Sequence, residues 1–172
     1  MALVPSAAIH GCWCYHLLYS FSVPPLMYQL HPIQHSATMF ITTNMQERKP
    51  TFANPAYARE AIEVLYRIKA LHSFCLFGFV IMPDHCHLLL RVPPEGALSK
   101  IMNRFKMGVS HSIGLGPLWQ AKFHASTPAN LFATLQYIHQ NPVRAELVRH
   151  PEDYRWSSAH AMWHVDPLWD NL

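Results

Sequence analysis

One hairpin pattern constrains this sequence more than any other feature. Two apolar runs between residues 74 and 92 flank a turn at Pro83-Asp84, and His85 and His87 open the second run. Apolar runs of this length around a short turn predict two antiparallel strands. Because strand side chains alternate between the faces of a sheet, both imidazoles project from one face, about 7 Å apart along the strand.

Two neutral imidazoles on one face supply half of a metal site, and they still need a third ligand. The chain has 13 histidines, so one His-x-His pair can also arise by chance. The alternative reading is a strand with two half-exposed histidines that bind water. The rest of the chain has to decide between these two interpretations.

The pattern along the chain predicts an α+β fold. Residues 37–43 and 118–124 are expected to add two strands to the hairpin. Helices are expected from an Asn54 cap to Leu71 and over residues 97–113, with a third from a Thr127 cap to Pro142. This order is the ferredoxin-like split βαβ pattern, an antiparallel sheet with helices on one face, followed by one extra helix.

The distribution of charge separates the N-terminal part from the rest. Residues 1–46 contain no Lys, Arg, Asp or Glu. We expect residues 1–35 to be a poorly ordered extension and residues 36–172 to be the folded domain. His10, Cys12, Cys14 and His16 alternate in this extension, but no second half of a zinc module follows them.

Hydropathy and cysteine usage limit the cellular setting. No stretch of about 20 apolar residues is present, so no membrane span is expected. The N-terminus lacks the basic region of a signal peptide, and four cysteines in 172 residues do not make a disulfide framework. These observations predict a cytoplasmic protein.

Basic residues are concentrated in the second half of the chain. Residues 91–149 hold seven basic side chains and two acidic ones, a local charge of +5. Such a segment suits a polyanion such as DNA, although a solvated basic face is an equally good reading. The residues expected to contact phosphates are Lys100, Arg104, Lys106 and Lys122.

The third predicted helix carries a second pair of chemical groups. Tyr137 and Asn141 are four residues apart, so they share one helix face, while Leu131, Leu135 and Ile138 form a packing stripe on another. In isolation such a pair is most often a half-buried tyrosine with a polar neighbour.

Four motifs in order make the resemblance specific. They are His85-Cys86-His87, Trp119-Gln120, the run from Tyr137 to Ala145, and the run from Tyr154 to Ser158. The set resembles the REP-associated tyrosine transposases, HUH-type relatives of the single-strand insertion-sequence transposases, and covers about residues 37–163. The resemblance implies a metal-dependent endonuclease and strand transferase that acts on single-stranded or hairpin DNA through a 5′-phosphotyrosine intermediate.

The same resemblance assigns roles to individual positions. Tyr137 is then the nucleophile, and His85, His87 and Asn141 are the metal ligands. Two imidazoles and an amide oxygen suit Mg²⁺ or Mn²⁺, with open positions for phosphate oxygens. Arg144 is expected to position DNA or to support the helix.

Two departures from the family pattern concern the substrate contacts more than the chemistry, and an alternative function stays open. The first strand, residues 39–43, lacks the tyrosine-histidine pair often seen at its start in that family, and Ala125-Ser126 follow Phe123-His124 where charged residues are usual. The alternative is a domesticated, inactive protein that binds single-stranded or hairpin DNA without cutting it. A histidine-triad nucleotide hydrolase is excluded because Leu89 stands where its third histidine belongs. Monomer and homodimer both remain open.

Overall fold

The computed structural model describes residues 36–168. The extension predicted for residues 1–35 lies outside the described residues. The strands are β1 (Thr38–Asn44), β2 (Cys75–Met82), β3 (His85–Arg91) and β4 (His124–Ser126), and the helices are α1 (Pro55–His72), α2 (Leu98–Ile113) and α3 (Leu131–Arg144). Three short 3₁₀ segments complete the list: η1 (Gln46–Arg48), η2 (Thr51–Ala53) and η3 (Pro151–Asp153). Within residues 36–168, no helix is both long and apolar enough to cross a membrane.

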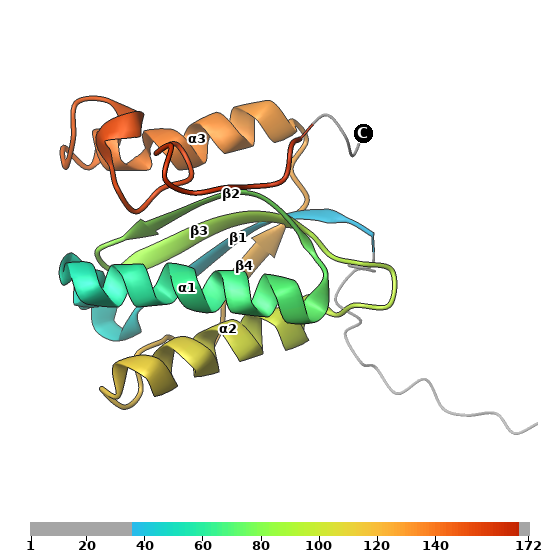
Figure 1. Ribbon diagram of the computed structural model, residues 1–172, viewed down its shortest axis with the longest axis horizontal. Coiled ribbons are helices and arrows are strands. Elements are labelled where there is room, and N and C mark those ends of the chain that lie inside the picture. The colour runs from blue at the N-terminus through green and yellow to red at the C-terminus, as the bar shows by residue number, and fades with distance from the viewer. Residues whose placement is uncertain (1–35, 169–172) are drawn as a thin grey trace, which may run out of the picture. The chain divides into compact units, whose positions relative to one another are not determined.

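The four strands form one antiparallel sheet in the order β2-β3-β1-β4. This order confirms the predicted split βαβ topology, because β3 lies between β2 and β1 (Figure 1). In the register of the two central strands, Thr42 of β1 is opposite His87 of β3, and Asn44 is opposite His85. The hairpin histidines therefore have polar partners on the neighbouring strand.

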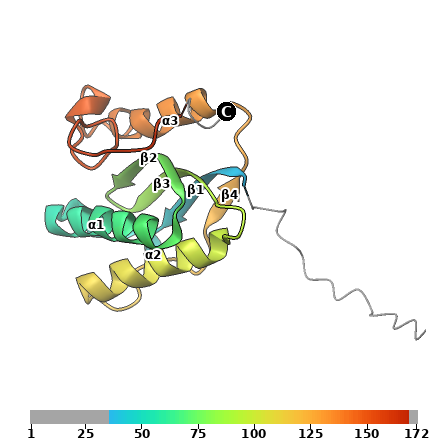
Figure 2. The same ribbon diagram turned by 45° about the vertical axis from the view of Figure 1, so that its right-hand side comes forward.

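The helices lie on both faces of the sheet. Helices α1 and α2 cover one face, as predicted, and α3 covers the other (Figures 1 and 2). The larger core lies between the sheet and α1 and α2, and its fully buried side chains include Ile41, Phe79, Leu88, Leu65 and Phe105. Removal of this apolar surface from water is the main force that holds these layers together.

The limits of α1 agree with its sequence signals. The Asn54 side chain accepts a hydrogen bond from the Ala56 N–H at 3.0 Å, and Pro55 occupies the first turn, where its missing N–H costs nothing. The helix ends at Ser73, whose φ of 49° is left-handed. The chain then turns directly into β2, which lies at one edge of the sheet.

The fourth strand was predicted at the wrong place. It covers His124–Ser126 rather than residues 118–124, and it pairs with β1. Trp119 makes only an isolated bridge to Met45. Its indole is 8% exposed, packs against Phe52 and Phe105, and donates a hydrogen bond to the Lys106 carbonyl at 3.1 Å. The apolar character of this segment thus reflects a core contact rather than a strand.

Both predicted ends of α3 need correction. The helix begins at Leu131, and its cap is Asn130, whose side chain accepts a hydrogen bond from the Ala133 N–H at 2.9 Å. Thr127 and Pro128 lie in the connection that precedes it. At the other end, Pro142 does not stop the helix, which continues to Arg144. A proline in the last turn removes only one backbone hydrogen bond, so two further residues stay helical.

A glycine allows α3 to pack closely on the sheet. A Cβ atom at Gly78 of β2 would overlap the side chain of Leu135. Ile138 of α3 is fully buried against a small second core that also contains Val80 and Leu89. This close approach fixes the height of α3 above β2 and β3, and with it the position of every side chain on the sheet-facing side of the helix.

The outer edge of β2 is covered by the segment that follows α3. The Ile81 N–H donates to the Trp156 carbonyl at 2.8 Å, and the Ser158 N–H donates to the Phe79 carbonyl at 2.9 Å. Further along, the Asp166 carboxylate accepts a hydrogen bond from the Leu76 N–H at 2.6 Å. These contacts satisfy backbone groups that an exposed edge strand would leave open to another chain.

Candidate metal and nucleophile site

The two hairpin histidines lie together on the sheet face that α3 covers. The ring centroids of His85 and His87 are 4.7 Å apart, which agrees with the period-two prediction. His87 is only 5% exposed and stacks on Phe40 of β1, with a centroid separation of 5.3 Å. The pair is therefore held inside the layer between β3 and α3 rather than hydrated on an open face.

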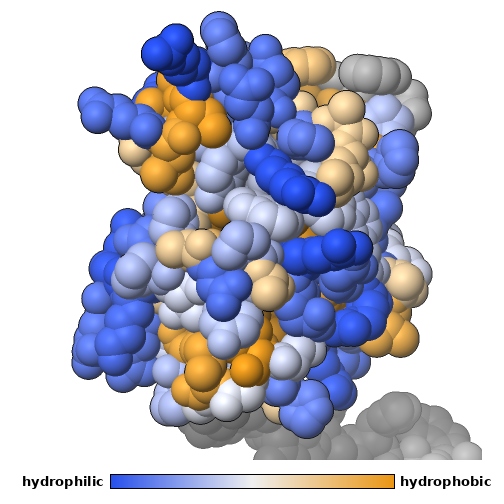
Figure 3. Space-filling view, turned by 60° about the vertical axis from the view of Figure 1, so that its left-hand side comes forward, coloured by the Kyte–Doolittle hydropathy of each residue, from blue (hydrophilic) through white to orange (hydrophobic). Residues whose placement is uncertain are grey.

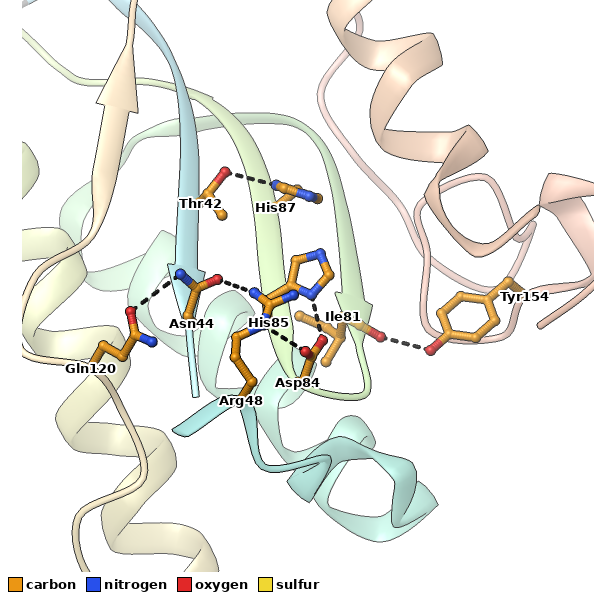
Figure 4. A network of polar contacts seen from close by, with 9 residues as sticks. All are labelled: Thr42, Asn44, Arg48, Ile81, Asp84, His85, His87, Gln120 and Tyr154. Carbon is orange, nitrogen blue, oxygen red and sulfur yellow. Dashed lines mark hydrogen bonds and ion pairs between the residues drawn. The ribbon is translucent and has the colours of Figure 1, made fainter. Parts of the chain in front are cut away.

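The orientation of His85 is set by the residue that precedes it. The Nδ1 atom of His85 lies 2.6 Å from an oxygen of Asp84 (Figure 4). The other oxygen of Asp84 lies 2.7 Å from Nε of Arg48. With Nδ1 engaged by the carboxylate, Nε2 is the ring nitrogen that remains to bind a cation.

His87 is oriented in a similar way from the neighbouring strand. Its Nδ1 atom lies 2.9 Å from the Thr42 hydroxyl (Figure 4). Burial lowers the pKa of His87 to about 4, and the nearby His85 and Arg48 act in the same direction, whereas a hydrogen bond with the Asn141 side chain opposes them. His87 is therefore neutral near pH 7, the state in which an imidazole can donate its lone pair to a metal ion.

Asn141 approaches the histidines from α3. A side-chain hydrogen bond with Asn141 is among the influences on the pKa of His87, which places the two residues next to each other. The Nδ2 atom of Asn141 donates to the Tyr137 carbonyl one turn earlier, at 2.7 Å. That bond directs the amide nitrogen along the helix and leaves the amide oxygen as the atom that can accept a hydrogen bond or coordinate a cation.

Tyr137 stands beside this group and is 39% exposed. It makes edge contacts with His87, at a centroid distance of 5.7 Å, and with Phe40, at 5.8 Å. The Arg144 guanidinium lies 5.0 Å from the ring centroid. Tyr137 also borders a hollow of about 390 Å³ between β1 and the start of α3, lined by Phe40, Ala129, Asn130, Ala133 and Thr134.

The candidate ligand atoms near His85 and His87 suit a hard divalent cation only if the amide oxygen of Asn141 is one of them. In the described part of the chain, no three His, Cys, Asp or Glu side chains gather in a way that could hold a metal ion. Two imidazole nitrogens and the oxygen of Asn141 form an N/O set of the kind that Mg²⁺ or Mn²⁺ accepts. The ligand roles of His85, His87 and Asn141 stay predictions that the geometry permits.

The five basic residues expected to contact DNA do not lie together. Arg144 is at the tyrosine, whereas Lys100 and Arg104 are on α2, behind the opposite face of the sheet. The ammonium of Lys106 donates to the carbonyls of Gln120 and Ala121, at 2.6 and 3.1 Å, so it holds a loop. Lys122 is exposed in the connection before β4. Their contacts with DNA stay a prediction, which the geometry favours most for Arg144.

Three residues of the site were not found from the sequence. They are Thr42, Arg48 and Asp84, which hold the two imidazoles. Asp84 was interpreted as a turn residue, and its position next to a candidate ligand was the one available signal. Thr42 reaches His87 through the pairing of β1 with β3, and Arg48 reaches Asp84 from η1, so no local spacing reveals either contact.

Comparison with known families identifies the class of protein. The sequence model of a family described as transposase IS200 like matches residues 34–141, which is more than half of the chain. The chain therefore belongs to the IS200-like transposases. A comparison with curated proteins finds no match.

Solved structures make the likeness more particular. The fold is similar to that of a REP-associated tyrosine transposase bound to a REP hairpin, with a TM-score of 0.66 and 23% identity, over 77% of this chain and 85% of the other. This agrees with the fold that the four motifs imply. A candidate transposase from Deinococcus radiodurans R1 also matches, with a TM-score of 0.48 and 16% identity, over 64% of this chain and 84% of the other.

Proposed function

We propose that this protein is a metal-dependent endonuclease and strand transferase for single-stranded DNA, with Tyr137 as its nucleophile. One observation carries the proposal: Tyr137, His87 and Asn141 meet across the gap between β3 and α3, with His85 beside them. A phenol beside two oriented imidazoles and an amide can supply a nucleophile and the ligands of an activating cation, which supports transfer of a phosphodiester to tyrosine.

The proposed reaction exchanges one phosphoester for another. The Tyr137 oxygen attacks the phosphorus, the bond from phosphorus to the 3′ oxygen breaks, and a 5′-phosphotyrosine and a free 3′-OH result. The phenolic proton passes to water and the departing 3′ oxygen takes up a proton. A bound Mg²⁺ or Mn²⁺ supplies charge stabilisation for the pentacoordinate phosphate. Because the bond energy is retained, the reverse attack by a 3′-OH joins strands without ATP.

The surroundings of Tyr137 favour an unpaired strand as substrate. The hollow beside the ring includes the aromatic side chains of Phe40 and Tyr137, on which an unpaired base with an open face can stack. The Arg144 guanidinium next to the ring is placed to contact a phosphate. The relative of similar fold was solved with a DNA hairpin, which supports hairpin DNA as the partner here.

A second candidate function is binding of hairpin DNA without cleavage. The observation that favours it is Phe40, an apolar side chain that stacks on His87 and adds neither a ligand nor a proton-transfer group to the site. Both functions predict DNA binding, so binding alone does not separate them.

Covalent capture separates the two. Purified protein is incubated with labelled hairpin DNA that carries a single-stranded flank, with Mn²⁺ or with EDTA. A denaturation-resistant protein–DNA adduct that requires Mn²⁺ is the expected result. DNA binding without an adduct under any divalent cation would instead establish the second candidate.

A further inference from the structure

A continuous chain of polar contacts leads from the surface to His85. The Asn44 amide donates to the Gln120 side chain at 3.3 Å and accepts from an Arg48 guanidinium nitrogen at 2.6 Å (Figure 4). Nε of Arg48 pairs with one oxygen of Asp84 at 2.7 Å, and the other oxygen lies 2.6 Å from Nδ1 of His85. One oxygen of the Asp84 carboxylate therefore pairs with the Arg48 guanidinium, and the other contacts the His85 ring.

The backbone around Arg48 is held in an unusual conformation. Glu47 and Arg48 have φ angles of 54° and 55°, in the left-handed region that disfavours residues with a Cβ atom. Such backbone persists only where the surroundings compensate for it, and it is concentrated at functional sites. Here the two side-chain contacts of Arg48 provide compensation.

Backbone contacts tie the same segment to the hairpin turn. The Met45 N–H donates to the Asp84 carbonyl, and the Phe52 N–H donates to the Pro83 carbonyl, each at 2.9 Å. The side chains of Asp84 and His85 are 24% and 13% exposed. The carboxylate therefore has a fixed place, partly screened from water, beside the ring.

We propose that Asp84 and Arg48 are positioning residues that select the ring tautomer of His85. Asp84 accepts a hydrogen bond from Nδ1–H, so the neutral ring carries its lone pair on Nε2. Arg48 holds the carboxylate in register with the ring. This inference deepens the proposed function, because it explains how His85 is prepared for a cation, but the tautomer itself exists without the metal.

A purely structural ion pair makes a different prediction. If the contact between Arg48 and Asp84 served only to close the turn, removal of the carboxylate would lower stability and leave the tautomer of His85 unchanged. The ring nitrogens therefore distinguish positioning from stabilisation. Metal affinity provides a second measurement that does not depend on DNA cleavage.

The test uses the metal-free full chain labelled with ¹⁵N at histidine. Long-range ¹H–¹⁵N spectra near neutral pH report the tautomer of each ring, and His85→Gln assigns the signal. We expect the Nδ1–H form in the wild type and a shift to the Nε2–H form in Asp84→Ala. Asp84→Asn, whose amide oxygen can still accept a hydrogen bond, is expected to retain the wild-type tautomer.

Mn²⁺ titration followed by electron paramagnetic resonance gives the second readout. Loss of an outer partner of a ligand typically weakens metal binding by about 10–100-fold, and we expect Asp84→Ala to fall in that range. Arg48→Gln is expected to weaken binding less, and to add little in the Asp84→Ala background, because both act through one ring. Glu47→Gln is the matched control, since Glu47 pairs with Lys49 at 3.1 Å and not with the site.

Each outcome decides one of the two proposals. An unchanged His85 tautomer in Asp84→Ala would overturn the positioning role, as would unchanged Mn²⁺ affinity in a chain that binds the ion. A wild-type Nδ1–H tautomer in a chain that binds no Mn²⁺ would support the positioning role and contradict the metal-dependent function. If Asp84→Ala does not fold, the test uses Arg48→Gln. The proposal is overturned if the Arg48→Gln and Glu47→Gln proteins have the same His85 tautomer and the same Mn²⁺ affinity.

Discussion

Tyr137 has two parts with separable roles at the scale of the residue. Its ring packs against Phe40, His87 and Arg144, whereas only its oxygen can form the phosphoester. Tyr137→Phe keeps the ring, so we expect stability to change by no more than about 1 kcal/mol and DNA binding to survive. Adduct formation is expected to vanish in the covalent capture assay. Tyr57→Phe on α1 is the control and should behave as the wild type. An adduct formed by the Tyr137→Phe protein would exclude Tyr137 as the nucleophile.

Tyr154 provides a pH-dependent contribution to stability. Its buried hydroxyl donates to the Ile81 carbonyl at 2.9 Å (Figure 4). Burial, with a smaller effect of the Cys86 thiol, raises its pKa from 10.0 to about 12. A raised folded-state pKa means that this stabilisation is complete below pH 10 and is lost as the pH rises through 12.

Tyr154→Phe is therefore expected to lose about 1 kcal/mol of unfolding free energy near pH 7, the value of one buried hydrogen bond. The difference from the wild type should shrink as the pH is raised above 10. Urea unfolding of both proteins across that range measures it. A difference that stays constant into the alkaline range would show that the hydroxyl does not titrate as described.

At the scale of the element, periodicity predicts which helices and strands exist better than it predicts where they begin and end. Helices α1 and α2 and the hairpin were predictable because caps, apolar stripes and a turn mark them locally. Of the three boundary errors, the place of β4 and the start of α3 arose from tertiary context. Trp119 looks like a strand residue but fills the core, and either Thr127 or Asn130 can cap a helix by its chemistry. The choice of Asn130 depends on the path that the chain takes from β4, at one edge of the sheet, to the face that α3 covers.

The site shows the same division between local and distant signals. His85 and His87 follow from strand alternation, and Tyr137 with Asn141 follows from one helical turn, so both pairs were predictable. Asp84 and Arg48 were not, because their roles exist only when η1 is brought against the hairpin turn.

The contact between α3 and β2 should couple packing to chemistry. Gly78→Ala places a methyl group against the end of the Leu135 side chain, which must move, at a typical cost of about 1–3 kcal/mol. Because Leu135 and Tyr137 are on one rigid helix, adduct formation is expected to fall more than the loss of folded protein explains. Adding Leu135→Ala should recover part of the nicking rate, although that change removes buried apolar surface. Urea unfolding and single-turnover nicking of the four proteins in this cycle measure the coupling. Strictly additive effects would contradict it.

At the scale of the whole molecule, the supporting helices and the candidate site lie on opposite faces of the sheet. The sheet has α1 and α2 on one face and α3 with the candidate site on the other (Figure 1). The surface in Figure 3 is a mosaic of hydrophilic and apolar patches rather than one broad apolar face. With a formal net charge of +3, affinity for DNA has to depend on where individual cations lie.

Substitutions of two basic residues are expected to have different effects on the affinity for hairpin DNA. Arg144 lies at Tyr137, whereas the ammonium of Lys106 is bonded to two carbonyls. Each phosphate contact on single-stranded DNA adds about 0.7 to the slope of log affinity against log salt, so Arg144→Gln should weaken hairpin binding and reduce the slope by roughly that amount. Lys106→Gln should lower thermal stability and leave the slope unchanged. Fluorescence anisotropy with a labelled hairpin over a salt series measures both, with the matching plain duplex as competitor. Equal affinity for the plain duplex, or an affinity insensitive to salt, would contradict a role in binding single-stranded or hairpin DNA. An equal loss of slope in Arg144→Gln and Lys106→Gln would instead place the DNA across Lys106 as well as at Tyr137.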